Sequence, residues 1–374
     1  MAKVQKDQEY YDRIKEKFAS ERDLRLGYRP QGTDQYTSDF SGAKEKYGVD
    51  PYAGSTNARE AINDSVEVLF IGGGFSALLT SARLREKGIE SIRIVERAGD
   101  VGGTWYWNRY PGVACDVISY DYLPLLDEMN YVPKRRYSGG EEILEHSRAI
   151  ARKYGLYDLA VFQTTVTSTV WNSDEKMWHV RTDRDDLMRA RFVVCANGTL
   201  SKPKLAKIEG IDEFSGHSFH TSRWDYDYTG KDLENLSDKR VGIIGTGATA
   251  VQAIPELGKR AKELFIFQRT PSSIDIRDDW ETDPEWASQR PKGWQAARRE
   301  KSLKAVEPSE SQLAEFATIS REEKIRRQEN ANIDYMMRIH RRIEQEVKDP
   351  EVAESLKPWY MFMCKRPCFH NEYL

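Results

Sequence analysis

The sequence predicts an α/β protein built from two strand–loop–helix units and a helical insertion. Each unit combines a short apolar run, a glycine-rich loop and a helix-like segment, and the loops span residues 72–77 and 245–250. The third observation is a strongly charged stretch, 275–357, which lacks the alternation of strands. Loops of the G-x-G-x-x-A type between a strand and a helix are typical of Rossmann-like dinucleotide-binding domains. The chain is therefore expected to hold two dinucleotides.

Both loops have the surroundings that this chemistry needs. Strands are predicted at 66–71 and 241–244, and helices at 78–87 and 251–262. Glycine lets the backbone approach a pyrophosphate, and the helix N-terminus offers N–H groups to it. A tight turn without a ligand is the alternative for either loop. The expected cofactor contacts in the two loops are Gly72, Gly74, Ala77, Gly245, Gly247 and Gln252.

The residue that ends the second strand of each unit distinguishes the two cofactors. Glu96 follows Gly72 by 24 residues, and Arg269 follows Gly245 by the same 24 residues. A carboxylate accepts hydrogen bonds from an unmodified ribose and repels a phosphate, which favours FAD or NAD. A guanidinium, here with Thr270 beside it, pairs with a 2′-phosphate and favours NADP. The pattern predicts FAD in the first unit and NADPH in the second.

A glycine- and aromatic-rich segment follows Glu96 at 101–116. Glycines this dense fit poorly in a regular helix or strand, so we expect a close-packed loop along the pyrophosphate or the flavin. Trp105 is expected to form a flat wall and Asp116 an inward polar group. An ordinary surface loop is the alternative. The expected cofactor contacts are Gly103, Thr104, Trp105, Asp116 and Tyr122.

The segment 214–225 between the two units resembles the fingerprint of Baeyer–Villiger monooxygenases, F-x-G-x-x-x-H-x-x-x-W-[P/D]. The matching residues are Phe214, Gly216, His220, Trp224 and Asp225. Related flavin monooxygenases that oxidise nitrogen and sulfur carry Tyr or Phe in place of Trp224. In the family this segment is a hinge between cofactor domains, so His220 is not expected to be the chemical base. A His and a Trp that merely pack a domain junction are the alternative.

Further segments extend the resemblance from about the first strand to the last residue. The residues 102–105, 110–112 and 195–198 are similar to the family's flavin loop and crossover, and 267–271 to its NADP-phosphate segment. Within 364–370, Arg366 matches the active-site arginine, and Lys365 is placed to contact the NADP phosphate. Ala77 stands where relatives usually have glycine, which is a tolerated change.

The resemblance implies an enzyme that uses FAD and NADPH to insert one oxygen atom of O2 beside a ketone carbonyl, giving an ester or lactone. The substrate subgroup it resembles acts on bulky cyclic ketones, including fungal secondary metabolites. Arg366 would stabilise the anions of the reaction without losing its own proton. Asp116 would orient Arg366, with a structural ion pair as the alternative.

Composition sets limits on other functions. The formal net charge is −3 and makes no electrostatic case for a nucleic-acid partner. The mean hydropathy is −0.71, and neither a membrane span nor an apolar leader is apparent, so a cytoplasmic protein is expected. The absence of a C-x-x-C pair counts against the disulfide reductases. Cys364, Cys368 and His370 lack a fourth ligand, so no metal site is expected.

The expected organisation has five segments. They are an N-terminal extension (1–63), an FAD-binding domain (64–205), an NADP-binding domain with the fingerprint linker (206–273), a helical insertion (274–359) and a return segment of the NADP domain that carries Arg366 (360–374). A helix is expected at 10–26 and a hairpin at 165–180. Two alternatives stay open. One is a monooxygenase that oxidises nitrogen or sulfur. The other is a shortened nucleotide-binding remnant without turnover, because relatives continue past the active-site arginine.

Overall fold

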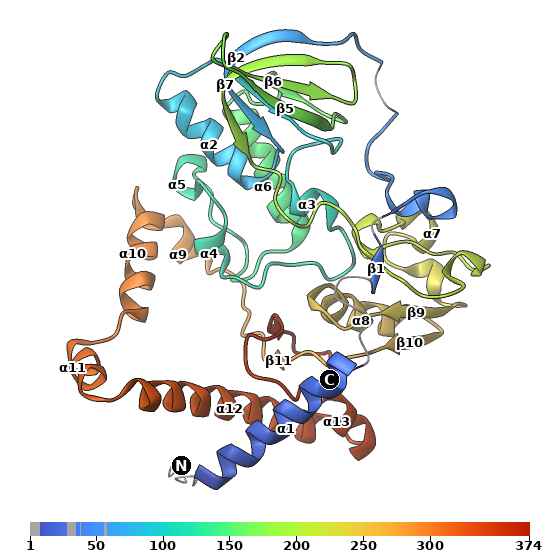
Figure 1. Cartoon of the computed structure of the whole chain (residues 1–374), viewed down its shortest axis with the longest axis vertical. Helices are drawn as coiled ribbons and strands as arrows, with labels where there is room; N and C mark the ends of the chain where they lie inside the picture. Colours follow the sequence, from blue (N-terminus) through green and yellow to red (C-terminus); the bar gives the residue numbers. More distant parts are fainter. Residues whose placement is uncertain (1–7, 28–34, 38, 56–57) are drawn as a thin grey trace. The chain divides into compact units, whose positions relative to one another are not determined.

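The computed structural model describes residues 8–27, 35–37, 39–55 and 58–374 (Figure 1). The chain divides into two compact units, which we describe separately. The sheet unit consists of Tyr36–Asp225 and Asp279–Ala297, and the helical unit consists of Met1–Gln35, Tyr226–Asp278 and Arg298–Leu374. Each unit contains one of the two glycine-rich loops.

A six-stranded mixed sheet forms the centre of the sheet unit. Its strand order is β4-β3-β2-β7-β6-β5. The strands are β2 (Asn63–Ile71), β3 (Ile92–Val95), β4 (Ala160–Val161), β5 (Val166–Asn172), β6 (Met177–Thr182) and β7 (Leu187–Cys195). Strands β4, β3, β2 and β7 are parallel, whereas β5, β6 and β7 form an antiparallel meander. The α/β class and the hairpin expected at 165–180 are thereby confirmed.

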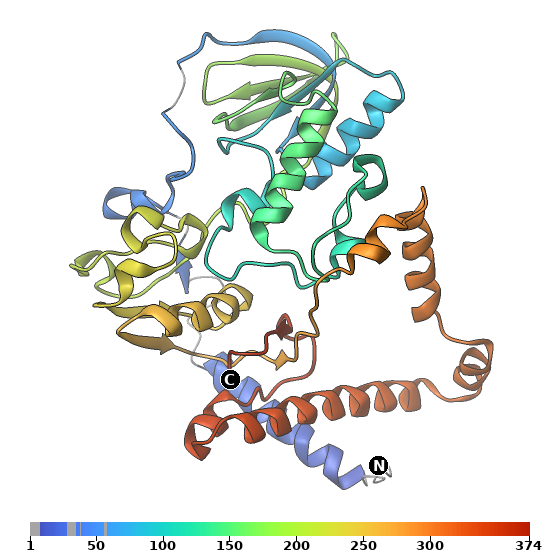
Figure 2. The ribbon, with the colours of Figure 1, turned by 180° about the vertical axis from the view of Figure 1, so that it is seen from behind.

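Two helices, α2 (Phe75–Glu86) and α6 (Gly140–Lys153), cover one face of this sheet (Figures 1 and 2). Phe70 and Ile94 from the strands pack with Leu78 of α2 and Ile150 of α6, and all four are fully buried. Burying each such side chain stabilises the fold by about 1.5–3 kcal/mol. This core holds the carboxyl end of β2, where the first glycine loop begins.

Shorter elements complete the sheet unit. They are β1 (Tyr36–Thr37), which pairs antiparallel with β8 (Leu205–Ala206), the 3₁₀ helices η1 (Gly42–Tyr47), η2 (Ile211–Glu213) and η3 (Thr221–Arg223), and the helices α3 (Thr104–Trp107), α4 (Ser119–Tyr122), α5 (Leu126–Met129) and α9 (Pro284–Ser288). Trp286 and Trp294 pack on Tyr120 in an aromatic cluster, whereas Trp280 is half exposed.

The second strand–loop–helix unit lies in the helical unit. It consists of β9 (Arg240–Ile244), α8 (Ala248–Arg260) and β10 (Glu263–Phe267), with the two strands parallel. The chain returns to this unit near its end, since β12 (Cys368–Phe369) pairs in parallel with β11 (Ile274–Asp275) and packs on Val251 of α8. Two short helices, α7 (Tyr226–Thr229) and η4 (Glu234–Leu236), precede β9.

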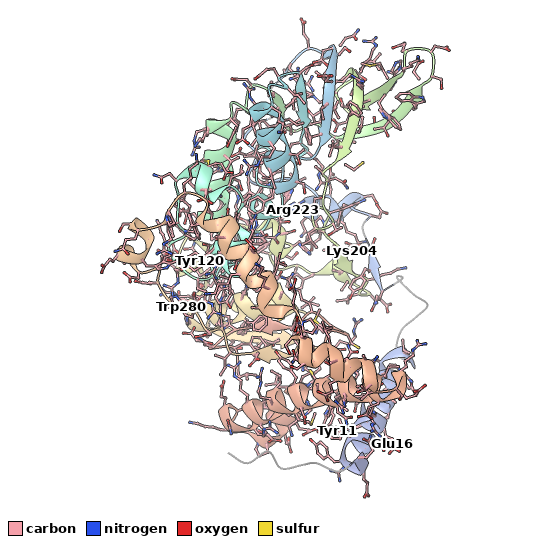
Figure 3. All side chains as sticks on the ribbon, turned by 90° about the vertical axis from the view of Figure 1, so that its left-hand side faces the viewer. Tyr11, Glu16, Tyr120, Lys204, Arg223 and Trp280 are labelled. Carbon is pink, nitrogen blue, oxygen red and sulfur yellow. The ribbon has the colours of Figure 1, made fainter. Side chains whose placement is uncertain are left out.

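Five further helices of the described chain lie wholly or partly in the helical unit. They are α1 (Gln8–Gly27), α10 (Trp294–Val306), which begins in the sheet unit, α11 (Glu310–Thr318), α12 (Arg321–Glu346) and α13 (Pro350–Leu356). Helix α1, marked by Tyr11 and Glu16 in Figure 3, packs on α12 through Phe18 and Met336. The Tyr11 hydroxyl donates to Asp334 at 3.1 Å.

The helix expected at 10–26 is α1, and the insertion is largely helical, as expected. Part of that insertion, Asp279–Ala297, belongs to the sheet unit. One reason is Gln295, whose buried amide donates to the carbonyl oxygens of Tyr120 and Leu123 at 3.1 and 2.6 Å. The five segment boundaries stay a prediction. Parts of the N-terminal extension, 1–7, 28–34, 38 and 56–57, lie outside the described residues.

Candidate functional site

The first glycine loop joins β2 to α2, and its backbone packs closely against the backbone of two other segments. Gly72 has a φ of +106°, and a Cβ atom there would lie 2.6 Å from the carbonyl oxygen of Ala196. A Cβ atom on Gly103 would lie 2.9 Å from the Cα atom of Gly74. Both positions therefore require glycine. No side chain caps α2 at Gly74, so the first turn of the helix can present backbone N–H groups to an anionic ligand.

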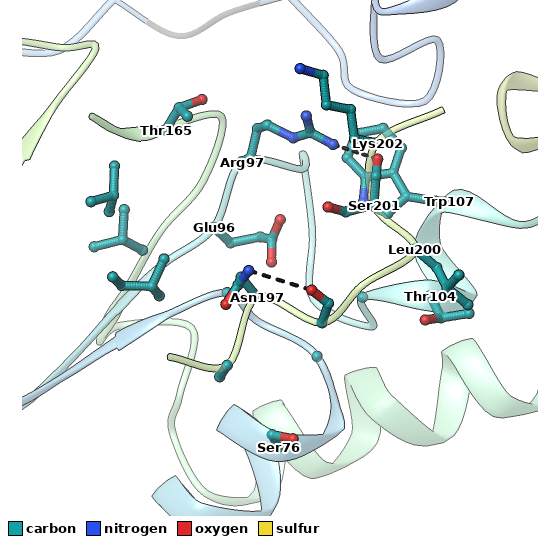
Figure 4. Close-up of a pocket in the computed structure, with 18 of the residues that line it drawn as sticks. Ser76, Glu96, Arg97, Thr104, Trp107, Thr165, Asn197, Leu200, Ser201 and Lys202 are labelled. Atoms are coloured by element: carbon teal, nitrogen blue, oxygen red, sulfur yellow. Dashed lines mark hydrogen bonds between the residues drawn. The ribbon is translucent and has the colours of Figure 1, made fainter. Parts of the chain in front are cut away.

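A cavity of about 630 Å³ lies beside this loop (Figure 4). Its size is within the range of small-molecule and cofactor sites, about 300–1,000 Å³. Seven residues expected from the sequence line it: Gly72, Gly74, Glu96, Gly103, Thr104, Trp105 and Tyr122. Ala77 does not line the cavity but is fully buried in α2, where it packs in the sheet core.

Glu96 connects the end of β3 to the glycine loop. Its side chain is buried, and its carboxylate accepts hydrogen bonds from the backbone N–H groups of Gly73 at 2.5 Å and Ala98 at 2.7 Å. Burial raises the pKa of the Glu96 carboxyl above its ordinary value, although these hydrogen bonds favour the charged form. The residue therefore both holds the loop and faces the cavity.

The cavity wall also contains residues that the sequence did not single out. Trp107, Arg97, Ser201 and Lys202 line the cavity, and Arg97 donates to the carbonyl oxygen of Ser201 at 2.6 Å. The Arg97 guanidinium lies 5.1 Å from the centre of the Trp107 ring. Two signals were present in the sequence, since Arg97 directly follows Glu96 and residues 201–202 follow the crossover at 195–198.

The second glycine loop leaves free space beside its two glycines, Gly245 and Gly247. Gly245 has a φ of +101°, whereas Gly247, at the N-terminus of α8, has a φ of −79°. A Cβ atom at either position would meet no described atom within 4 Å. The conformation explains the glycine at 245, but neither packing nor strain requires one at 247. Close approach of a ligand to the backbone would account for it, as expected from the sequence. Gln252 is buried in α8 behind the loop.

The helical unit also brings together Arg269, Thr270 and Lys365. The Lys365 ammonium donates to the carbonyl oxygen of Thr270 at 2.8 Å. Burial lowers the pKa of Lys365, and the nearby charge of Arg269 lowers it further. Arg269 is exposed, and its guanidinium donates to the side chain of Gln35. Two cations at the end of β10 form a place where an anionic group would be favourable.

The fingerprint residues lie together in the sheet unit. The ring of Phe214 packs on Gly216, where a Cβ atom would lie 2.5 Å from the end of that ring. Trp224 is buried, and the Nε2 atom of His217 lies within hydrogen-bond distance of the Asp225 carboxylate at 2.8 Å. The position of the Phe214 ring therefore favours a residue without a side chain at position 216.

The side chain of His220 caps a short helix. Its Nδ1 atom accepts a hydrogen bond from the backbone N–H of Ser222 at 3.1 Å, which caps the short helix η3. Burial, followed by the charge of Arg223, lowers the pKa of His220 to about 4. The imidazole is therefore neutral near pH 7. That His220 is not the chemical base stays a prediction.

Asp116 and Arg366 lie in different units. Asp116 is partly buried in the loop before α4 and does not line the cavity, and Arg366 is exposed in the loop before β12. Their expected proximity stays a prediction. Among the described residues no cluster of three or more His, Cys, Asp or Glu side chains is arranged to hold a metal, and no helix is both long and apolar enough to cross a membrane.

Comparison with known proteins identifies the family. Residues 69–355 match the family model described as pyridine nucleotide-disulphide oxidoreductase. A Baeyer–Villiger monooxygenase of Stachybotrys chlorohalonatus is 45% identical over 96% of this chain and 61% of its own length. The polycyclic ketone monooxygenase of Thermothelomyces thermophila has a TM-score of 0.85 and 34% identity over 97% of this chain and 65% of that one. OTEMO in complex with FAD and NADP has a TM-score of 0.69 and 29% identity over 82% of this chain and 63% of that one.

Three facts qualify these similarities. The chain spans less than two thirds of the length of these relatives. The similarity also includes most of the N-terminal extension, which precedes the first predicted strand and carries none of the motifs of the expected resemblance. None of the four cysteines, all in the described part of the chain, forms a disulfide, so the chain matches the family model without a C-x-x-C centre. The chain belongs to the Baeyer–Villiger monooxygenase family, within the pyridine nucleotide-disulphide oxidoreductases.

Proposed function

We propose that this chain is the nucleotide-binding part of an FAD- and NADPH-dependent Baeyer–Villiger monooxygenase. Its proposed reaction is the insertion of one oxygen atom of O2 beside the carbonyl group of a bulky ketone. The observation that carries the proposal is the difference between the two glycine loops. One faces a cavity with a buried carboxylate, Glu96, and the other lies in the same unit as two cations, Arg269 and Lys365.

FAD fits the cavity of the sheet unit. Its pyrophosphate would lie over the first turn of α2, where no side chain caps Gly74. Glu96 would accept hydrogen bonds from the ribose, and Trp105 and Tyr122 would bound the site. A relative of similar structure, OTEMO, is solved with FAD and NADP. When bound, FAD supplies the transfer of electrons from NADPH to dioxygen.

NADPH fits the second loop, so the fold is proposed to contain two Rossmann-like dinucleotide-binding domains. The pyrophosphate would approach Gly245 and Gly247, above which the described chain leaves room. Arg269, Thr270 and Lys365 would bind the 2′-phosphate, because a guanidinium and an ammonium together favour a doubly charged group.

The chain's own contribution to the chemistry is the placement of charge. A guanidinium stays protonated at any physiological pH, so Arg366 would hold its positive charge beside the substrate oxygen as negative charge develops there. Asp116 would orient that guanidinium. We extend both assignments from the family resemblance, and the exposure of Arg366 leaves it accessible to a ligand.

The substrate class follows from the relatives. The similar polycyclic ketone monooxygenase is named for a bulky substrate, and the sequence resembles the subgroup that acts on bulky cyclic ketones, including secondary metabolites. Oxidation of nitrogen or sulfur is the second candidate, but Trp224 disfavours it.

One set of measurements separates these candidates. The absorption spectrum of the purified chain reports bound flavin, and its bleaching by NADPH reports electron transfer between the two cofactors. Oxygen uptake with and without a polycyclic ketone, followed by mass spectrometry of the product, identifies the reaction. A lactone or ester supports the proposal, an N- or S-oxide alone supports the second candidate, and a colourless protein that gains no flavin on titration with FAD contradicts the proposal.

A further inference from the structure

A segment of the N-terminal extension packs along the fingerprint. We term residues 42–53 the strap. The hydroxyl groups of Tyr47 and Ser218 are 2.9 Å apart, and the Tyr52 hydroxyl accepts a hydrogen bond from the backbone N–H of Trp224 at 2.8 Å. The strap and the fingerprint belong to the same compact unit as the cavity.

The strap also contacts the outer side of the cavity wall. The carboxylate of Asp50 accepts hydrogen bonds from the Tyr106 hydroxyl at 2.9 Å and from the backbone N–H of Gly99 at 3.2 Å. Tyr106 stands in α3 between Trp105 and Trp107, which line the cavity. The strap therefore holds the short helix that forms this wall.

One buried side chain, Arg223, joins the strap, the wall and the crossover. Its Nε atom donates to the carbonyl oxygen of Val49 at 3.1 Å, and its two Nη atoms donate to the carbonyl oxygens of Ser222 at 2.8 Å and Ser201 at 3.3 Å. The face of the guanidinium lies 3.8 Å from the centre of the Trp107 ring. Both Ser201 and Trp107 line the cavity.

This arrangement uses properties that only arginine has. Arg223 is 3% exposed, and in the described part of the chain no carboxylate lies within ion-pair distance of it. Burial, and after it the neighbouring charge of Arg97, lower the pKa of Arg223 to about 10. A buried, unpaired cation is unfavourable. A planar guanidinium can nevertheless stack on a ring while its edge donates to three separate carbonyls, which an ammonium cannot do.

We propose that Arg223 is a positioning residue for the cofactor cavity, which fixes Trp107 against the crossover at Ser201 while the strap holds Arg223 in place. The proposal rests on the proposed function in naming FAD as the ligand. Arg223 would not contact the reacting atoms. Its effect would be to keep the wall in the shape that FAD requires before FAD binds, because a preformed site loses less free energy on binding.

The test measures FAD binding by the full chain, without reference to turnover. Apoprotein is titrated with FAD by flavin fluorescence, and the visible circular dichroism of the bound flavin is recorded. Arg223→Lys keeps the charge but loses the planar fork, and we expect about tenfold weaker binding, which corresponds to about 1.4 kcal/mol, with a changed dichroism band. Arg191→Lys, at a side chain 64% exposed on β7, is the matched control and should keep the parent affinity and spectrum.

The outcomes separate this inference from the proposed function. If the parent binds FAD and Arg223→Lys binds it with the same affinity and spectrum, the positioning role is wrong and the proposed function stands. If the parent itself binds no FAD, both fail. Should Arg223→Lys not fold, as judged by far-ultraviolet dichroism, Tyr52→Phe decides, because it removes only the oxygen atom that accepts the Trp224 N–H. Weaker FAD binding by that variant supports the role, and unchanged binding overturns it.

Discussion

The carboxylate of Glu96 accepts a hydrogen bond from the backbone N–H of Gly73 at 2.5 Å, which ties the end of β3 to the loop after β2. The same side chain lines the cavity. A ligand ribose at this place would therefore meet an acceptor that is already held by the loop around its pyrophosphate. The structural role and the proposed binding role of Glu96 are thus linked in one carboxylate.

We expect Glu96→Ala to weaken both folding and FAD binding. The change leaves the buried N–H groups of Gly73 and Ala98 without their acceptor, and each unsatisfied group costs about 1–3 kcal/mol. Urea unfolding measures the free energy of unfolding, and fluorescence titration measures FAD affinity. Glu90→Ala, at an exposed residue of the same unit, is the control. Parent-like FAD affinity in Glu96→Ala would contradict the assignment.

The two glycine loops should respond differently to alanine. Gly72→Ala should destabilise the sheet unit, because its φ is +106° and the added Cβ would lie 2.6 Å from the Ala196 carbonyl oxygen. In Gly247→Ala the added Cβ would meet no described atom within 4 Å. Because Gly247 is the N-cap residue of α8, this change should lower the free energy of unfolding by only about 1 kcal/mol. It should nevertheless weaken NADPH binding while FAD binding stays unchanged, as isothermal titration calorimetry would show. Equal NADPH affinity for parent and Gly247→Ala would argue against the second site.

Removal of Lys365 should change the discrimination between NADPH and NADH. Lys365→Ala removes one of the two cations at the end of β10, and a hydrogen bond to a charged group is worth about 1.5–3 kcal/mol, or about 10- to 100-fold in affinity. The loss should appear for NADPH and not for NADH, which lacks the 2′-phosphate. Lys259→Ala, an exposed lysine of α8, is the control. An equal loss for both nucleotides would show that Lys365 does not bind the phosphate.

His220 should make stability depend on pH. Its pKa is lowered from 6.5 to about 4 in the folded protein, so the folded state prefers the neutral ring. This contribution is present above pH 6.5 and is lost as the pH falls towards 4, by at most about 3 kcal/mol. His220→Asn keeps a capping acceptor and cannot titrate. Urea unfolding of both proteins across this pH range should show that the free energy of unfolding falls less steeply with pH in the variant than in the parent. The same dependence on pH in both proteins would refute the prediction.

Arg366→Ala should slow oxygen insertion. In a preparation that turns over ketone, loss of one donor to a developing anion should raise the barrier by at least about 2.7–4 kcal/mol, which is about 10²- to 10³-fold in rate. Gas chromatography of the ester or lactone measures this rate. Arg341→Ala, at an exposed position of α12, is the control. Product formation by Arg366→Ala at the parent rate would remove Arg366 from the active site.

Local patterns allowed much of the fold and of the first site to be predicted. A glycine with a positive φ, an apolar strand before it and a helix after it are short-range features, so both strand–loop–helix units and the hairpin at β5 and β6 could be recognised. The cavity-facing positions of Glu96 and Trp105 follow from the same local order. Arg97 directly follows Glu96, which was the available signal for it, whereas nothing in the linear pattern distinguishes Trp107, a wall residue, from a surface residue.

The sequence by itself determined the type of each nucleotide loop and the opposite charges of Glu96 and Arg269. Only the tertiary structure decided which distant residues join them. Lys365 reaches Thr270 because β12 pairs with β11, and Arg223 reaches Val49 because the strap packs along the fingerprint. Such contacts depend on how separate segments bury their surfaces against one another, and a local sequence pattern carries no information about that packing.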